Sequence, residues 1–156
     1  MLRTQRSRLR QTKGNELIEF ALVLVLLLVP MFVGTVEVGR AYYTYNILTK
    51  SVRNAARYLS ASQISPSGVV PSAYVTSARN LSIYGNVAGT GSKILPGLSP
   101  ANITVSGVAS PGASPNEFYV TVSADYPYSP LFGFILSSVN FRPKVTMVFV
   151  GVIRGT

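Results

Sequence analysis

The sequence contains no cysteine, no histidine and no tryptophan among its 156 residues. Disulfide bonds, thiolate nucleophiles, Cys/His zinc sites and a histidine general base are therefore excluded. Acidic residues are also scarce, since 5 Asp+Glu stand against 14 Lys+Arg. So few carboxylates, spread along the chain, leave little for acid–base catalysis or for binding hard metal ions. We expect a structural or binding protein without a cofactor, and not an enzyme.

Basic residues are concentrated at the start of the chain. Five of the 14 lie within the first thirteen positions, where no acid occurs: Arg3, Arg6, Arg8, Arg10 and Lys13. Such an arm can bind nucleic acid, but the sequence shows no nucleic-acid recognition module. We therefore expect no nucleic-acid partner and interpret residues 1–14 as a basic leader.

A long apolar segment follows this leader. The 17 residues from Phe20 to Val36 carry no charge, and as a helix they span roughly 26 Å, close to the ~30 Å hydrocarbon core of a bilayer. We predict a membrane-spanning helix over 15–39 that contacts lipid, with the leader in the cytoplasm and the C-terminal part exported. Pro30 should bend this helix, because it cannot donate to the Leu26 carbonyl.

A cleaved secretory signal and a buried core helix both fit the apolar segment less well than a membrane span. A secretory signal usually has an apolar run of 7–15 residues followed by a small-residue cleavage site, and no convincing site of that kind follows here. A buried core helix would need a larger domain around it.

The junction between leader and helix contains two acids, Glu16 and Glu19. An acid at the edge of a membrane helix loses hydration, which is costly. In one interpretation both acids lie in the first turns of a helix, where the helix dipole favours negative charge, with Asn15 as the N-cap.

The remaining residues, 40–156, predict an exported α+β domain. Its first part, 40–60, should continue the long helix, because apolar residues recur there at steps of three and four. This expected buried stripe comprises Ala41, Tyr45, Leu48, Val52, Ala55, Ala56 and Leu59. A second, weaker helix is expected from Ser72 to Tyr84, closed by Gly85.

Downstream the apolar period becomes two, as in strands. Strands are predicted at 102–108 and 118–126, and the segment 144–154 is apolar on both faces, which favours a central strand or one packed against a partner. We interpret 127–142 as a loop or short helix on the sheet, or alternatively as an interaction surface. An antiparallel sheet of about three to four strands results.

Three segments together resemble TadE-like proteins, which are pseudopilins of the tight-adherence (Tad or Flp) type IV pilus. The first is Gly14 to Phe20 with its apolar run, which is similar to the class III signal of type IV pilins. The second is Val36 to Tyr43 (VEVGRAYY), followed by Ala55-Ala56-Arg57-Tyr58. The third, a looser match, is Val120 to Pro130 with the apolar C-terminal strand.

This resemblance implies that a prepilin peptidase cuts the chain between Gly14 and Asn15. Lys13, Glu19 and Phe20 would then matter for processing or assembly. The cut makes Glu19 the fifth residue of the mature chain, and its carboxylate can pair with the new α-amino group of a neighbouring subunit. In a medium of low dielectric such pairing lowers the cost of both charges.

The implied function is that of a minor pilin or pseudopilin that primes or caps a Tad pilus from the bacterial inner membrane. The implied partners are the prepilin peptidase, other pilins that bind through the N-terminal helix, and inner-membrane platform proteins. Two alternatives stay open: a major filament subunit, and an unprocessed single-span anchor whose exported domain binds a partner.

Glu37 and Arg40 lie three residues apart, just beyond the apolar run. At this spacing they can form a surface ion pair on a helix, which contributes little to stability in water. At the exit from a membrane the same residues can instead neutralise charge at the interface or contact a neighbouring pilin. The sequence does not choose between these roles.

Overall fold

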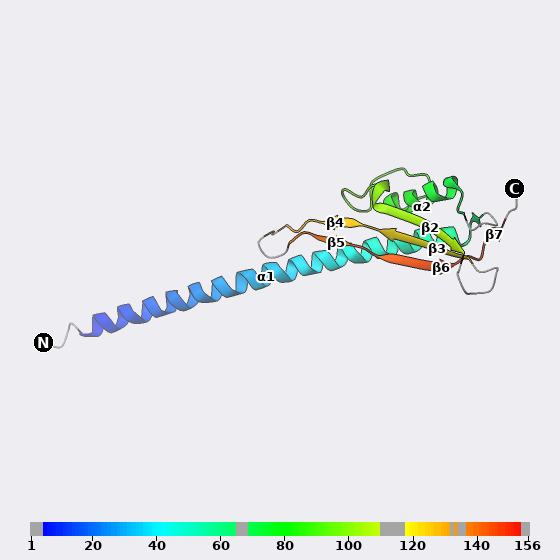
Figure 1. The fold of residues 1–156 in the computed structure, drawn as a ribbon. Coiled ribbons are helices and arrows are strands. Elements are labelled where there is room, and N and C mark those ends of the chain that lie inside the picture. The colour runs from blue at the N-terminus through cyan, green and yellow to red at the C-terminus, as the bar shows by residue number, and fades with distance from the viewer. Residues whose placement is uncertain (1–4, 65–68, 110–117, 132, 134–136, 154–156) are drawn as a thin grey trace. The chain divides into compact units, whose positions relative to one another are not determined.

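The computed structural model describes residues 5–64, 69–109, 118–131, 133 and 137–153 (Figure 1). The chain divides into two compact units, Met1–Arg40 and Ala41–Thr156. The first is helical, and the second contains helices and antiparallel strands. The predicted α+β class is confirmed.

One helix, α1, extends from Gln5 to Ser60 and contains Pro30. The prediction that the apolar segment continues into residues 40–60 as helix is confirmed. The helix begins earlier than the N-cap hypothesis requires, because the backbone is already helical from Gln5. Asn15 lies inside α1, so its assignment as an N-cap is wrong for this chain. An N-cap needs non-helical backbone in front of the first turn.

The part of α1 that belongs to the second unit buries one stripe. Leu48, Val52, Ala55, Ala56 and Leu59 are all fully buried, as predicted. Tyr45 departs from the prediction with 42% exposure, and Thr44 is buried in its place. The stripe packs in a single core with residues of the second helix and of the strands.

The second helix, α2, extends from Ser72 to Tyr84, with the bounds that the sequence predicted. Gly85 ends it in the left-handed conformation, at φ 74°, and donates its N–H to the Leu81 carbonyl. Glycine adopts this conformation without the steric cost that a Cβ atom adds, which is why it is common just after a helix.

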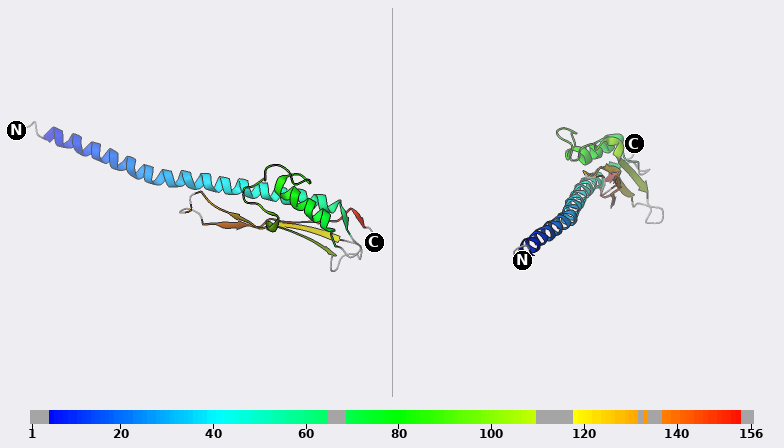
Figure 2. Two further views of the ribbon diagram at one scale, coloured as in Figure 1. Left: turned by 90° about the horizontal axis from the view of Figure 1, so that it is seen from above. Right: turned by 90° about the vertical axis from the view of Figure 1, so that its left-hand side faces the viewer.

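The main sheet has three antiparallel strands in the order β2-β3-β6, visible in Figures 1 and 2. They are β2 (Ile103–Ala109), β3 (Phe118–Ala124) and β6 (Lys144–Val148), and the short 3-10 helix η1 (Pro100–Asn102) precedes β2. Alternate residues of β3 are buried, which confirms the predicted period of two. The buried side chains are Phe118, Val120, Val122 and Ala124.

The central position predicted for 144–154 is wrong, because β3 is the central strand and β6 lies at an edge. The chain then continues into β7 (Val152–Ile153), which pairs in parallel with β1 (Gln63–Ile64) directly after α1. The apolar run also does not bury both faces here, because alternate residues of β6 are exposed and Val148 and Val150 are 49% and 77% exposed.

The segment 127–142 is also different from the expected loop or short helix. It contributes to a two-stranded antiparallel sheet of β4 (Tyr126–Tyr128) and β5 (Val139–Phe141). Aromatic packing explains this pairing, because the Phe141 ring stacks on Tyr128 at 5.0 Å between centroids and meets Tyr45 edge-on at 5.6 Å. Such ring pairs stabilise by more than the area they bury. Residues 132 and 134–136 of this segment lie outside the described residues.

Gly151 provides a test of how closely β7 docks on the end of α1. A Cβ atom at this position would collide with the Ser62 carbonyl oxygen and with the Phe149 ring. Gly151→Ala is therefore expected to destabilise the second unit by about 1–3 kcal/mol. Thermal unfolding of the detergent-solubilised chain should show a lower Tm, by roughly 4–8 °C per kcal/mol.

Gly133→Ala is the matched control, because a Cβ atom there has no neighbour within 4 Å. The control should unfold like the unmodified chain. Equal Tm values for the two variants would contradict the close docking of β7.

Candidate functional site

The N-terminal unit presents an apolar surface on every side of α1. All residues from Gly14 to Phe32 are exposed, and Leu26 and Phe32, for example, are 71% and 72% exposed. Within the part of the chain that the structure describes, α1 is the one helix long and apolar enough to cross a membrane. An apolar cylinder of this length is stable where lipid or other helices cover it.

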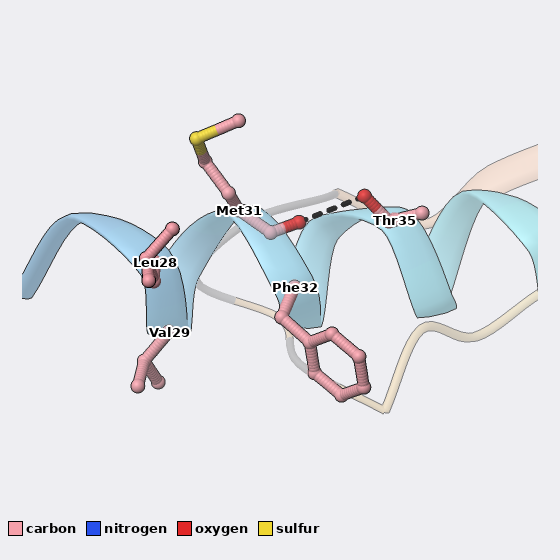
Figure 3. A pocket seen from close by; sticks show the side chains of 5 residues that line it. All are labelled: Leu28, Val29, Met31, Phe32 and Thr35. Atoms are coloured by element: carbon pink, nitrogen blue, oxygen red, sulfur yellow. Dashed lines mark hydrogen bonds between the residues drawn. The ribbon is translucent and has the colours of Figure 1, made fainter. Parts of the chain in front are cut away.

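The surface around Pro30 illustrates this exposure (Figure 3). A shallow hollow there is lined by Leu28, Val29, Met31, Phe32 and Thr35, and the side chains of Met31 and Phe32 point to different sides of the helix. The Thr35 hydroxyl donates to the Met31 carbonyl at 2.9 Å. Thr35 is the one polar side chain that lines the hollow. Because its hydroxyl hydrogen is used in this internal bond, it does not donate a hydrogen bond to solvent.

The residues of the expected cleavage site lie within α1. Gly14 is exposed, and a Cβ atom added to it would have no neighbour within 4 Å. Packing against the described residues therefore does not require glycine at this position, although glycine costs a helix about 1 kcal/mol relative to alanine. The side chain of Lys13 lies outside the described part of the structure.

Glu16, Glu19 and Phe20 follow on the exposed surface of the same helix, and Phe20 is 66% exposed. Neither of the two ion pairs between described side chains involves Glu16 or Glu19. Both carboxylates are exposed at the edge of the apolar run. The structure brings the residues expected to act in processing onto one short stretch of helix.

Glu37 and Arg40 form the ion pair that their spacing predicted, with 3.6 Å between Arg40 Nη1 and Glu37 Oε1. The pair is not a surface pair, because the Glu37 side chain is only 1% exposed while that of Arg40 is 40% exposed. A buried carboxylate needs a cation or hydrogen-bond donors close by, and Arg40 supplies one.

Sequence reasoning missed one relation between the acids. Glu19 and Glu37 are 18 residues apart, which is five turns of an ideal helix, so they share one side of it at about 27 Å separation. The two carboxylates therefore bracket the apolar run at close to the ~30 Å thickness of a bilayer core. The spacing of these two acids in the sequence was enough to predict that they lie on one side of the helix.

Comparison with known proteins characterises this N-terminal segment. Residues 14–57 match the family model described as TadE-like protein. No curated protein and no solved structure matches the chain. The resemblance to TadE-like proteins is confirmed over the matched residues, and it supports a pilin-like protein associated with a Tad pilus.

The exposed apolar run makes a direct prediction about membrane insertion. Leu26→Arg places a charge near the middle of the run, which costs about 2.5–3.5 kcal/mol at the centre of a membrane helix. The fraction of chains that resist alkaline extraction from membranes should fall. Tyr43→Arg is the control, since Tyr43 is similarly exposed but lies beyond the run. Equal extraction of both variants would argue against a spanning helix.

Proposed function

We propose, from the TadE-like sequence of residues 14–57, that this chain is a minor pilin or pseudopilin that primes or caps a Tad-type pilus. It is not itself an enzyme. The observation that supports the proposal most directly is the order of features on α1: Gly14, an exposed Glu19, and an apolar surface open on all sides. This arrangement suits a helix that moves from lipid into a bundle with other helices.

In this proposal residues 15–39 cross the bacterial inner membrane once. The N-terminus is cytoplasmic and residues 40–156 are exported. The distribution of charge supports this orientation, since five basic residues precede the apolar run and no acid accompanies them within the first thirteen positions. Arg40, the first cation beyond the run, is paired with Glu37, which reduces the positive charge on the exported side.

Prepilin peptidase cleaves the chain after Gly14 in this proposal, and the apolar helix stays in the mature product. The open space around Gly14 supports a role for glycine in recognition by another protein, because no contact with the described residues requires it. Lys13 on one side of the cut and Phe20 on the other belong to the recognised segment.

Glu19 sets the axial register between subunits. A carboxylate surrounded by apolar side chains is costly when unpaired and much less so beside a positive charge. Cleavage creates such a charge, the α-amino group of Asn15, four residues before Glu19. The amine of one subunit and Glu19 of the next can therefore pair when the helices bundle with the platform proteins and other pilins.

Processing is the decisive test. Co-expression of the chain with a prepilin peptidase should yield a mature product that begins at Asn15, as read by mass spectrometry of its N-terminus. Gly14→Val should block the cut, because a branched side chain obstructs the backbone next to the scissile bond. Gly34→Val is the matched control, since Gly34 is equally free of neighbours but lies inside the apolar run. A wild-type product that retains Met1 would leave the unprocessed single-span anchor as the better function.

The register hypothesis predicts separate effects of Glu19 on assembly and on insertion. Glu19→Gln keeps the size of the side chain and removes its charge, so pairing with the neighbouring amine is lost. Membrane insertion and cleavage should remain normal, while the number of surface pili should fall at least about tenfold, as expected when a buried charge loses its partner. Pili counted by electron microscopy provide the measurement. Wild-type piliation in this variant would refute the pairing.

A further inference from the structure

The second unit carries an exposed basic face on α1. Lys50, Arg53 and Arg57 follow one another at steps of three and four and are all exposed, on the side of the helix away from its buried stripe. Neither ion pair between described side chains involves them. We name these three residues the basic face.

The described acids offer few partners for the basic face within the same chain. Glu37 is paired with Arg40, and Asp125 is paired with Arg142 at 3.0 Å. Glu16 and Glu19 are the described acids that neither pair includes, and both are exposed on the N-terminal unit. These two acids and the basic face lie on the same helix, whereas the other described and exposed cations outside the two ion pairs, Lys93 and Lys144, lie on the loop after α2 and on β6.

The spacing of these charges matches. Glu16 and Glu19 are three residues apart, Lys50 and Arg53 are three residues apart, and 34 positions separate each acid from its counterpart. Two parallel copies of α1 shifted by 34 residues, about 51 Å along the helix, would bring both acids opposite both cations at once. Helices in contact lie 8–10 Å apart, which long side chains of this kind bridge.

We propose that Glu16 and Glu19 of one copy bind the basic face of a second copy, with Glu16 opposite Lys50. This inference rests on the proposed function, because it needs copies that assemble through α1. Glu16 has no part in the pairing of Glu19 with the amine of an adjacent subunit. The two carboxylate oxygens of Glu19 allow it to accept from that amine and from Arg53 of the displaced copy. An unrelated polyanion would fit the cations but would not involve Glu16.

The length of the shift restricts where the contact forms. A displacement of about 51 Å exceeds the ~30 Å hydrocarbon core, so two copies at equal depth in a membrane cannot make it. Copies displaced along a filament axis can. The contact therefore distinguishes assembled subunits from the membrane pool.

The absence of cysteine allows a clean cross-linking experiment. Glu16→Cys combined with Lys50→Cys leaves Glu19 and Arg53 in place and should give a disulfide-linked dimer in sheared filaments, but not in the membrane fraction. Glu16→Cys with Lys93→Cys is the matched control, because Lys93 is exposed but lies on the loop after α2, and it should give no dimer. A dimer of equal yield in the membrane fraction, or cross-links to other pilins alone, would overturn the proposal.

Charge exchange tests the same contact without thiols. Lys50→Glu should lower the amount of the chain in filaments about tenfold, because like charges then face each other across the interface. Adding Glu16→Lys should restore incorporation to within about twofold, with cleavage after Gly14 verified by mass spectrometry because Glu16 lies within the recognised segment. Lys93→Glu alone should have no effect. An unchanged Tm of the Lys50→Glu variant excludes misfolding as the cause. Wild-type incorporation of that variant would refute the contact.

The two proposals fail in different ways. If the wild-type chain is neither cleaved after Gly14 nor found in filaments, the pilin function itself is wrong. If the wild-type chain is cleaved and incorporated while cross-linking and charge exchange have no effect, only the contact between the acid pair and the basic face is wrong.

Discussion

The constraint on which the molecule depends is the apolar surface between Glu19 and Glu37. Each Leu, Val or Phe side chain gains about 1.5–3 kcal/mol on leaving water, and α1 presents such side chains around its whole circumference. The hydrophobic effect is non-directional, so lipid or neighbouring helices can equally well remove these side chains from water. In the proposed function, that equivalence would let a single helix serve first as a membrane span and then as part of a bundle. The acids at its two ends differ in this respect, because Glu19 is exposed while Glu37 is buried beside Arg40.

In the second unit, the same helix is apolar on one side and charged on the other. Beyond Ala41 the apolar residues narrow to one stripe, which the sheet and α2 cover, while the charged side chains keep to the other side. One helix is thus apolar all round from Phe20 to Phe32 and amphipathic beyond Ala41. Small polar residues within the packed part of α1, such as Ser51 and Ser60, donate their hydroxyl groups to backbone carbonyls of the same helix.

Sequence reasoning worked where one residue's role depends on its near neighbours. The buried stripe of α1, the alternation of β3 and the end of α2 at Gly85 all follow from local period or from backbone sterics. The segment Gly14 to Phe20 was recognisable for the same reason, because another protein would read it as a linear motif. The β4–β5 pair was missed because Phe141 finds its ring partners in Tyr128 and Tyr45, far away in sequence. Likewise two-residue strands such as β1 have no period to detect, and the sequence does not reveal that Glu37 is buried.

Pro30 gives α1 a mechanical property that its composition alone does not suggest. A continuous helix resists stretching through its ladder of backbone hydrogen bonds, and Pro30 removes the bond to the Leu26 carbonyl in the middle of the apolar run. Under tension, the helical turn between Leu26 and Pro30 is therefore the part of α1 that unfolds most easily. Pulled from both ends, the helix would yield there first and lengthen by about 1.8 Å for each residue that passes from helical to extended backbone. A thread built from such rods would be extensible without losing the packed units along it.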